Sequence, residues 1–112
     1  MTLQEYETGA RSTARYPNDA TLLYPVLKLA GESGEVAEKL GKAMRDGGWT
    51  PGAALDDDVR DALVKELGDV LWYVASVAVD LGSSLDEVAE TNLAKLASRQ
   101  ERGAIHGSGD DR

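Results

Sequence analysis

Hydrophobic residues recur every three or four positions through most of this 112-residue chain, which is the spacing of one face of an α-helix. No segment alternates hydrophobic and polar residues with the period of two that is typical of a β-strand. The pattern therefore predicts an all-α fold. The expected helices cover about residues 3–15, 20–45, 57–81 and 85–102.

Residues that start or stop helices support these boundaries. Thr2 is suited to cap the first helix, and Pro17 in "YPND" disfavours helix at the residue before it. Residues 46–55, "DGGWTPGAAL", have the glycine and proline content of a loop. Ser84 and Glu87 have the spacing of a capping box at the start of the last helix.

The third predicted helix is apolar around most of its circumference, which indicates that it is buried on most sides. One domain of this size has difficulty covering such a helix, so a homodimer or homotetramer is expected. The alternative is a central helix covered by the other three. The main apolar stripe consists of Val59, Leu63, Leu67, Val70, Val74, Val77 and Leu81.

Composition narrows the possible functions. The net charge of −8 argues against a nucleic-acid or anionic membrane surface, and the absence of cysteine excludes disulfides and thiolate metal sites. No apolar signal segment or membrane span is recognisable, so a cytoplasmic protein is expected. We expect one domain over residues 1–112, in which residues 103–112 form a tail that is flexible or ordered only by contacts.

Two pairs of acidic residues stand out on the second and third predicted helices. Glu32 and Glu35 are three residues apart, as are Glu66 and Asp69, so each pair shares a helix face. Two facing pairs would provide hard oxygen donors without histidine or cysteine, which suits Mg²⁺ and also Mn²⁺. The alternative is that the acids are solvated or paired with lysines, of which the nearest in sequence are Lys28, Lys39 and Lys65.

Glycines accompany these acids within the predicted helices. Gly31, Gly34 and Gly68 each cost a helix interior about 1 kcal/mol relative to alanine. Such residues are expected where another backbone or a ligand comes close, and ordinary helix packing is the alternative.

The segments "GESGEVAEKLGKAMRDGG", "KELGDVLWYVASVAVDLG" and "NLAKLASR" resemble the MazG-type nucleoside triphosphate pyrophosphohydrolases of the all-α NTP pyrophosphatase superfamily. The resemblance extends from about Tyr16 to the C-terminus and implies a four-helix MazG-like bundle. Its signature, E-x-x-E followed by E-x-x-D, falls on Glu32, Glu35, Glu66 and Asp69. The chain departs from some relatives in a long connection between the two pairs and in having Gly31 where some have an acid.

The resemblance implies Mg²⁺-dependent hydrolysis of an NTP or dNTP between the α and β phosphates, a house-cleaning reaction that yields a nucleoside monophosphate and pyrophosphate. The four signature acids would bind the metal and perform catalysis. The resemblance also makes Asn92 and Lys95 candidates for phosphate contacts. Lys42 and Arg45 are further candidates because of their charge, although Lys42 is also placed to pair with Glu38.

The sequence leaves several points open. The preferred nucleotide is not specified, and general cleavage, removal of modified nucleotides and selective cleavage of dUTP or dCTP are all compatible with the sequence. Trp72, Tyr73 and Trp49 could contact a base, although the first two are more typical of a packed core. The alternative function is a non-catalytic helical bundle that assembles or binds a partner.

Overall fold

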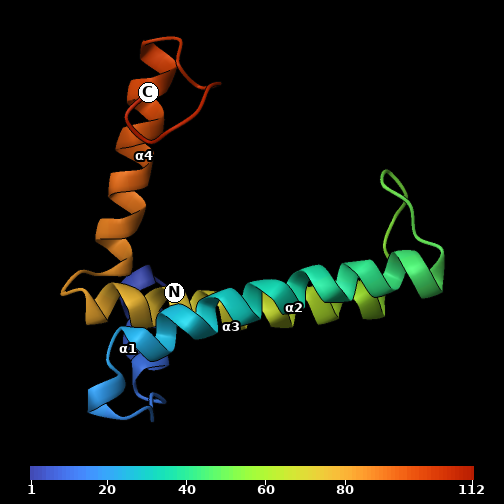
Figure 1. Cartoon of the computed structure of the whole chain (residues 1–112), viewed down its shortest axis with the longest axis horizontal. Helices are drawn as coiled ribbons and strands as arrows, with labels where there is room; N and C mark the ends of the chain where they lie inside the picture. The colour runs from blue at the N-terminus through green and yellow to red at the C-terminus, as the bar shows by residue number, and fades with distance from the viewer.

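The computed structural model describes residues 1–112 and contains four α-helices and no β-strand, which confirms the predicted fold class. The helices run antiparallel or cross one another without closing into a compact bundle within the single chain (Figure 1). One turn of 3₁₀-helix, η1, separates the first two helices. The bounds are α1 Leu3–Arg11, η1 Asn18–Ala20, α2 Leu23–Gly47, α3 Asp57–Asp80 and α4 Leu85–Glu101.

Helix α1 begins where the sequence predicted and ends earlier. The Thr2 hydroxyl accepts a hydrogen bond from the Glu5 backbone at 3.1 Å, and the Glu5 carboxylate accepts one from the Thr2 backbone at 2.8 Å. The helix ends at Arg11 because the hydroxyls of Ser12 and Thr13 donate to carbonyl groups of its last turn. Such local hydrogen bonds compete with helix continuation.

The capping box predicted for α4 is only half formed. The Ser84 hydroxyl accepts a hydrogen bond from the Glu87 backbone at 3.1 Å, as expected for an N-cap. The Glu87 carboxylate, however, accepts a hydrogen bond from the Ser83 hydroxyl at 2.5 Å instead of one from the Ser84 backbone. The capping box predicted the Ser84 backbone as the donor to the Glu87 carboxylate, whereas the donor is the Ser83 hydroxyl.

Helices α2 and α3 form a long antiparallel hairpin that dominates the molecule (Figure 1). The loop between them, residues 48–56, is closed by the Trp49 indole, which donates to the Ala53 carbonyl at 3.0 Å. Neither helix, nor any other in the chain, combines the length and apolar composition that crossing a membrane requires. The hairpin aligns the two acid-bearing helices side by side.

Helix α1 crosses α3 and is fastened to it by side chains. The Trp72 indole donates to the Ala10 carbonyl at 3.0 Å and to the Thr13 hydroxyl at 2.9 Å. The Glu7 carboxylate accepts a hydrogen bond from the Leu85 backbone at 2.7 Å, at the first turn of α4. The N-terminal helix therefore joins the end of the hairpin to the start of α4.

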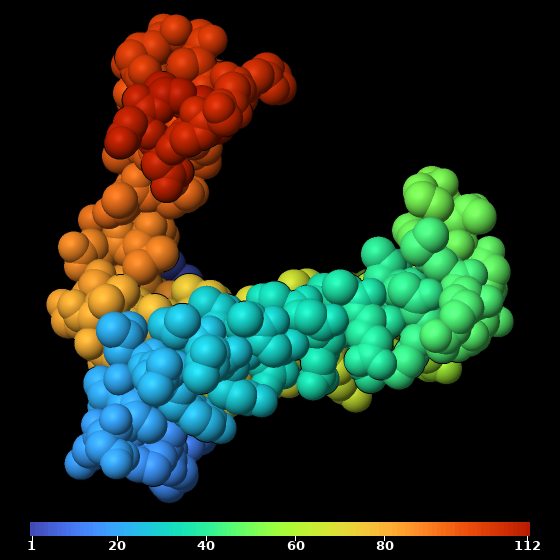
Figure 2. Space-filling model, in the orientation of Figure 1, coloured from blue at the N-terminus to red at the C-terminus, as the bar shows by residue number.

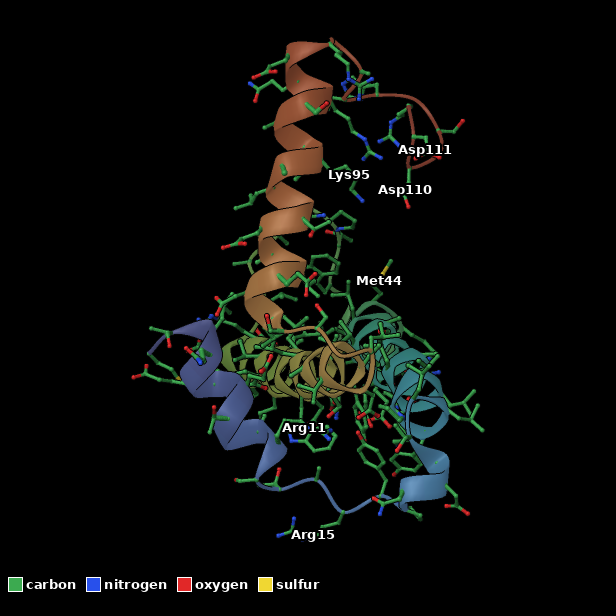
Figure 3. All side chains as sticks on the ribbon, turned by 90° about the vertical axis from the view of Figure 1, so that its left-hand side faces the viewer. Arg11, Arg15, Met44, Lys95, Asp110 and Asp111 are labelled. Atoms are coloured by element: carbon green, nitrogen blue, oxygen red, sulfur yellow. The ribbon has the colours of Figure 1, made fainter.

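Helix α4 leaves the hairpin as a separate arm after Gly82, whose φ of +74° lies in the left-handed region that glycine favours (Figure 2). The tail, residues 103–112, folds back along α4 (Figure 3). Arg99 holds it by donating to the Asp110 carbonyl at 2.8 Å, and Arg102 donates to the Arg112 carbonyl at 2.7 Å.

The single chain leaves much apolar surface uncovered. Its radius of gyration is 17.0 Å, whereas a compact chain of this length would have about 13 Å. Its accessible surface is 7871 Å², compared with about 5,900 Å² for a compact monomer of the same mass. The strongly exposed apolar residues include Leu23, Leu27, Val64, Leu67, Leu81 and Leu93. Part of the stripe predicted on the third helix is thus open to solvent.

Candidate functional site

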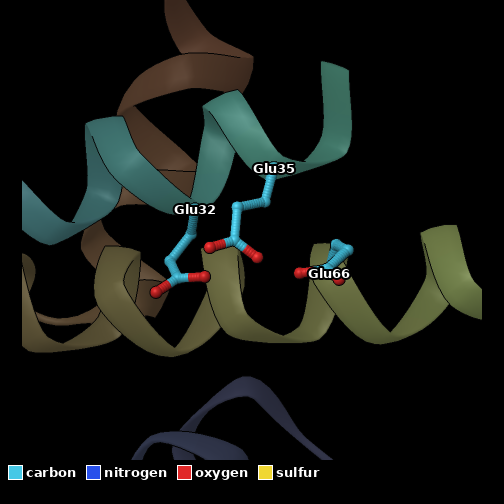
Figure 4. Close-up of side chains that lie close together, drawn as sticks. All are labelled: Glu32, Glu35 and Glu66. Atoms are coloured by element: carbon cyan, nitrogen blue, oxygen red, sulfur yellow. The ribbon is translucent and has the colours of Figure 1, made fainter. Parts of the chain in front are cut away.

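Three of the predicted acids come together in the middle of the α2–α3 hairpin. Glu32 and Glu35 come from successive turns of α2 and Glu66 comes from α3, and each has a carboxylate oxygen within 4.8 Å of the others (Figure 4). The three-residue spacing places the first two on the face of α2 that is directed at α3. We refer to Glu32, Glu35 and Glu66 as the carboxylate group.

Lysines offset only part of the charge of this group. Lys28 Nζ lies 3.0 Å from Glu32 and Lys39 Nζ lies 3.5 Å from Glu66, whose carboxylate side chains are 12% and 13% exposed. The hydrogen bond to Glu32 and its charge raise the pKa of Lys28. The more exposed Glu35 makes no ion pair. Lysine pairing, the alternative drawn from the sequence, therefore accounts for two of the three acids.

Asp69, the fourth predicted ligand, lies beside the carboxylate group and not within it. It lines an adjoining pocket together with Glu32. It also lies near Tyr6 of α1, and burial followed by the charge of Asp69 raises the pKa of that phenol. Metal binding by Asp69 stays a prediction.

The adjoining pocket has a volume of about 500 Å³ and is rich in aromatic side chains. Glu32 lies both in this pocket and in the carboxylate group, so the two adjoin each other. We refer to it as the aromatic pocket. Its lining consists of Thr13, Arg15, Tyr16, Pro17, Tyr24, Glu32, Asp69, Trp72 and Tyr73.

Tyr16 and Tyr24 were missed as site residues by the sequence analysis. Pro17 indicated only that helix is disfavoured at Tyr16, and no role was predicted for Tyr24. Trp72 and Tyr73, considered core residues, are instead half-buried at the pocket wall. No local signal joins Tyr16 to Tyr24, because they are eight residues apart on either side of η1.

Lys42 and Arg45, predicted as phosphate ligands, have partners on their own helix. Lys42 Nζ lies 2.8 Å from Glu38, which confirms the surface pairing predicted for that glutamate. Arg45 makes two hydrogen bonds to Asp46, at 2.8 and 2.9 Å. Lys42 lies about 10 Å along α2 from Glu35, so neither cation joins the carboxylate group.

Asn92 and Lys95, the other predicted phosphate ligands, lie on the α4 arm. They line a separate hollow of about 300 Å³ together with residues at the start of α4. Lys95 Nζ lies 3.2 Å from the Asp110 carboxylate of the tail (Figure 3). Within one chain, α4 therefore does not bring these side chains to the hairpin site (Figure 1).

The helical glycines do not serve a close approach within the chain. A Cβ atom placed on Gly31, Gly34 or Gly68 would meet no atom within 4 Å outside its own helix turn. Within one chain no other helix comes close to these glycines, because α2 and α3 present other residues to each other there. The expectation that another backbone or a ligand comes close to them stays a prediction.

Comparison with known proteins bears on this arrangement of acids. The family model described as "MazG nucleotide pyrophosphohydrolase domain" matches residues 21–103. The chain is 42% identical to the "Gene 37 protein" of Mycobacterium phage L5 over 118 aligned positions that cover all of both chains. No solved structure matches. The match includes Glu32, Glu35 and Glu66, and the chain belongs to the family of MazG nucleotide pyrophosphohydrolase domains.

Proposed function

We propose that this protein is a Mg²⁺-dependent pyrophosphohydrolase that cleaves an NTP or dNTP between its α and β phosphates. The observation that carries the proposal is the carboxylate group, which is assembled from two helices within the part of the chain that matches the family. The aromatic pocket beside it offers space for the remainder of a nucleotide.

The carboxylate group suits a hard divalent cation. It offers three carboxylates and no nitrogen or sulfur ligand, and it retains negative charge after pairing with Lys28 and Lys39. Carboxylate oxygens are the ligands preferred by Mg²⁺ and Mn²⁺. Glu32, Glu35 and Glu66 would hold the ion, and Asp69 is the fourth proposed ligand. When bound, Mg²⁺ supplies charge neutralisation at the phosphates and makes a bound water more acidic.

Side chains of the carboxylate group and of the aromatic pocket would orient the triphosphate and keep other molecules from contacting it. The oxygen of a water molecule bonds to the α-phosphorus, and the bond from that phosphorus to the bridging oxygen breaks. Pyrophosphate leaves with the electron pair of that bond, and the water releases a proton to the solvent. Glu32 belongs to both the carboxylate group and the aromatic pocket, so it lies between the proposed sites for the triphosphate and for the rest of the nucleotide.

We also propose that the protein works as a homodimer or homotetramer. The surface of 7871 Å² exceeds that of a compact monomer by about 2,000 Å² per chain, an area in the range of stable subunit interfaces. Leu67 of α3 is 53% exposed, although it belongs to the predicted apolar stripe. A partner chain could also bring Asn92 and Lys95 of its α4 to the hairpin site, which one chain alone does not do.

Light scattering after size-exclusion chromatography tests the assembly. Leu67→Glu is expected to reduce the mass to that of a monomer or a smaller assembly, because it places a charge on the apolar face. Lys65→Gln, an exposed neighbour on the same helix, should leave the mass unchanged. A monomeric parent protein would refute the assembly.

Pyrophosphate release tests the activity. A panel of NTPs and dNTPs that includes dUTP and dCTP would be assayed with and without Mg²⁺, for the parent protein and for Glu35→Gln. Glu38→Gln is the matched control, because Glu38 lies one turn further along α2 and pairs with Lys42 on the surface. Release that needs Mg²⁺, survives in Glu38→Gln and disappears in Glu35→Gln supports the proposal. A folded parent protein that releases no pyrophosphate from any nucleotide would favour the non-catalytic helical bundle.

A further inference from the structure

The aromatic pocket has one wall that the family match does not include. Thr13, Arg15, Tyr16 and Pro17 line it from the segment between α1 and η1, whereas the match begins at residue 21. The opposite wall comes from α2 and α3 and carries Glu32 and Asp69. The pocket is therefore assembled from the matched domain and from a segment that lies outside the family match.

Four aromatic rings form a continuous series in this pocket. Tyr16 stacks on Tyr24 with centroids 5.4 Å apart and an interplanar angle of 24°. Tyr24 lies 6.3 Å from Tyr73, and Tyr73 meets the edge of Trp72 at 4.8 Å. Aromatic faces of this kind bind planar bases through stacking, which tolerates or selects bases according to the space around them.

Lys28 connects the aromatic rings to the carboxylate group. Its Nζ lies 5.9 Å from the centre of the Tyr73 ring and 3.0 Å from the Glu32 carboxylate. The pocket volume of about 500 Å³ is within the usual range for small-molecule sites. A nucleoside in the pocket would thus lie next to Glu32, the acid that the pocket shares with the carboxylate group.

The segment that carries Tyr16 is fixed to α3 by Asp80. The Tyr16 hydroxyl donates to Asp80 at 2.8 Å and accepts from Arg11 at 2.5 Å, while the Leu22 backbone donates to the same carboxylate at 2.9 Å. The Asp80 side chain is only 6% exposed. Trp72 fastens the other end of the segment through Thr13. A segment held at both ends has the rigidity that base discrimination requires.

We propose that the aromatic pocket binds the nucleoside of the substrate and that residues 13–17, through Tyr16, determine which base is accepted, an inference that rests on the proposed function. Tyr16 is the specificity-determining residue, and Asp80 is a positioning residue that sets the orientation of its ring.

Binding of nucleoside monophosphates tests the proposed nucleoside site without requiring hydrolysis. Trp49→Phe provides the background, because Trp49 lies in the α2–α3 loop and its replacement leaves Trp72 as the one tryptophan. Nucleoside monophosphates should change the Trp72 fluorescence in a saturable manner, whereas ribose 5-phosphate and tripolyphosphate, which lack a base, should not. An equal response to ribose 5-phosphate would overturn the proposal without any further variant.

Substitution of Tyr16 tests the specificity role. Tyr16→Ala should weaken nucleoside monophosphate binding by about 5-fold to 150-fold, the range for loss of one base–aromatic stack. Tyr16→Phe keeps the ring and loses the bond to Asp80, so it should retain binding but alter the ranking of the four bases. Binding and ranking unchanged in both variants would overturn the proposal.

The two proposals fail separately. Loss of nucleoside monophosphate binding in Tyr16→Ala, in a protein that hydrolyses no triphosphate, would uphold the pocket and overturn the hydrolase function. Mg²⁺-dependent hydrolysis that Glu35→Gln abolishes and the Tyr16 variants do not affect would uphold the function and overturn the pocket.

Discussion

Replacing Asp80 by alanine is expected to release residues 16–22 from α3. The Asp80 carboxylate accepts hydrogen bonds from the Tyr16 hydroxyl at 2.8 Å, the Leu22 backbone at 2.9 Å and Arg11 at 3.4 Å. Leu22 has a φ of +67° and a ψ of −50°, a conformation that side-chain-bearing residues rarely adopt. Asp80 therefore stabilises both a pocket wall and a strained turn.

The free energy lost in Asp80→Ala follows from the burial of the carboxylate and the lengths of its hydrogen bonds. A hydrogen bond to a charged group contributes about 1.5–3 kcal/mol, and two of the bonds to Asp80 are short. Removing one partner from a buried ion pair costs about 3–5 kcal/mol, and Asp80 is 6% exposed. We therefore expect Asp80→Ala to lower the free energy of opening this region by about 3–5 kcal/mol.

Amide hydrogen exchange measures the effect where it occurs. Exchange of the Leu22 amide should accelerate by at least about 100-fold, since about 1.4 kcal/mol corresponds to a factor of ten. Asp61→Ala is the matched control, because Asp61 lies on the same helix and pairs with the adjacent Arg60 at 65% exposure. It should change stability by less than about 0.5 kcal/mol. An Asp80→Ala protein with Leu22 exchange within threefold of the parent would refute the reasoning.

Three further predictions follow from local contacts. Ser84→Ala should lower the free energy of unfolding by about 1 kcal/mol through loss of the α4 cap, measured by denaturation at a fixed protein concentration. Mg²⁺ at about 100 times its Kd should stabilise the parent by about 2.7 kcal/mol, and Glu35→Gln should remove this stabilisation in a thermal melt. Hydrogen bonding and charge from Lys95 and then Arg99 lower the pKa of Asp110, so its contribution to tail docking is present above the ordinary pKa of 3.8 and is lost as pH falls through the lowered pKa. A side-chain carboxyl resonance of Asp110 that titrates at neutral pH instead would contradict this.

The helices were predictable because their signals are local. Periodicity, the Thr2 cap and the glycine-rich loop placed all four elements, and the largest error was the end of α1, where the hydroxyls of Ser12 and Thr13 compete for backbone carbonyls. The departure of α4 as a separate arm was not predictable. It depends on the turn at Gly82 and on which surfaces are covered by other elements.

The site was predictable only as far as helix geometry determines it. Glu32, Glu35 and Glu66 follow from three-residue spacing and the facing of two apolar helices. Glu66 and Asp69 have the same three-residue spacing as Glu32 and Glu35, so the spacing alone does not reveal that Asp69 lines the neighbouring pocket instead of joining the carboxylate group. Tyr16 could not be assigned from its neighbours, because its hydrogen-bond partner Asp80 is 64 residues away.

The open arrangement of the chain has a consequence for how much active protein a cell would hold. Only eight of 112 residues are buried within one chain, so intrachain burial offsets little of the entropy lost on ordering the helices. In the proposed homo-oligomer, the association of chains provides the missing stabilisation. Folding is then coupled to association and is of higher than first order in the chain concentration. The unfolding temperature should rise with total protein concentration. The amount of folded protein would rise more steeply than the amount of chain synthesised, and dilution alone would favour unfolding.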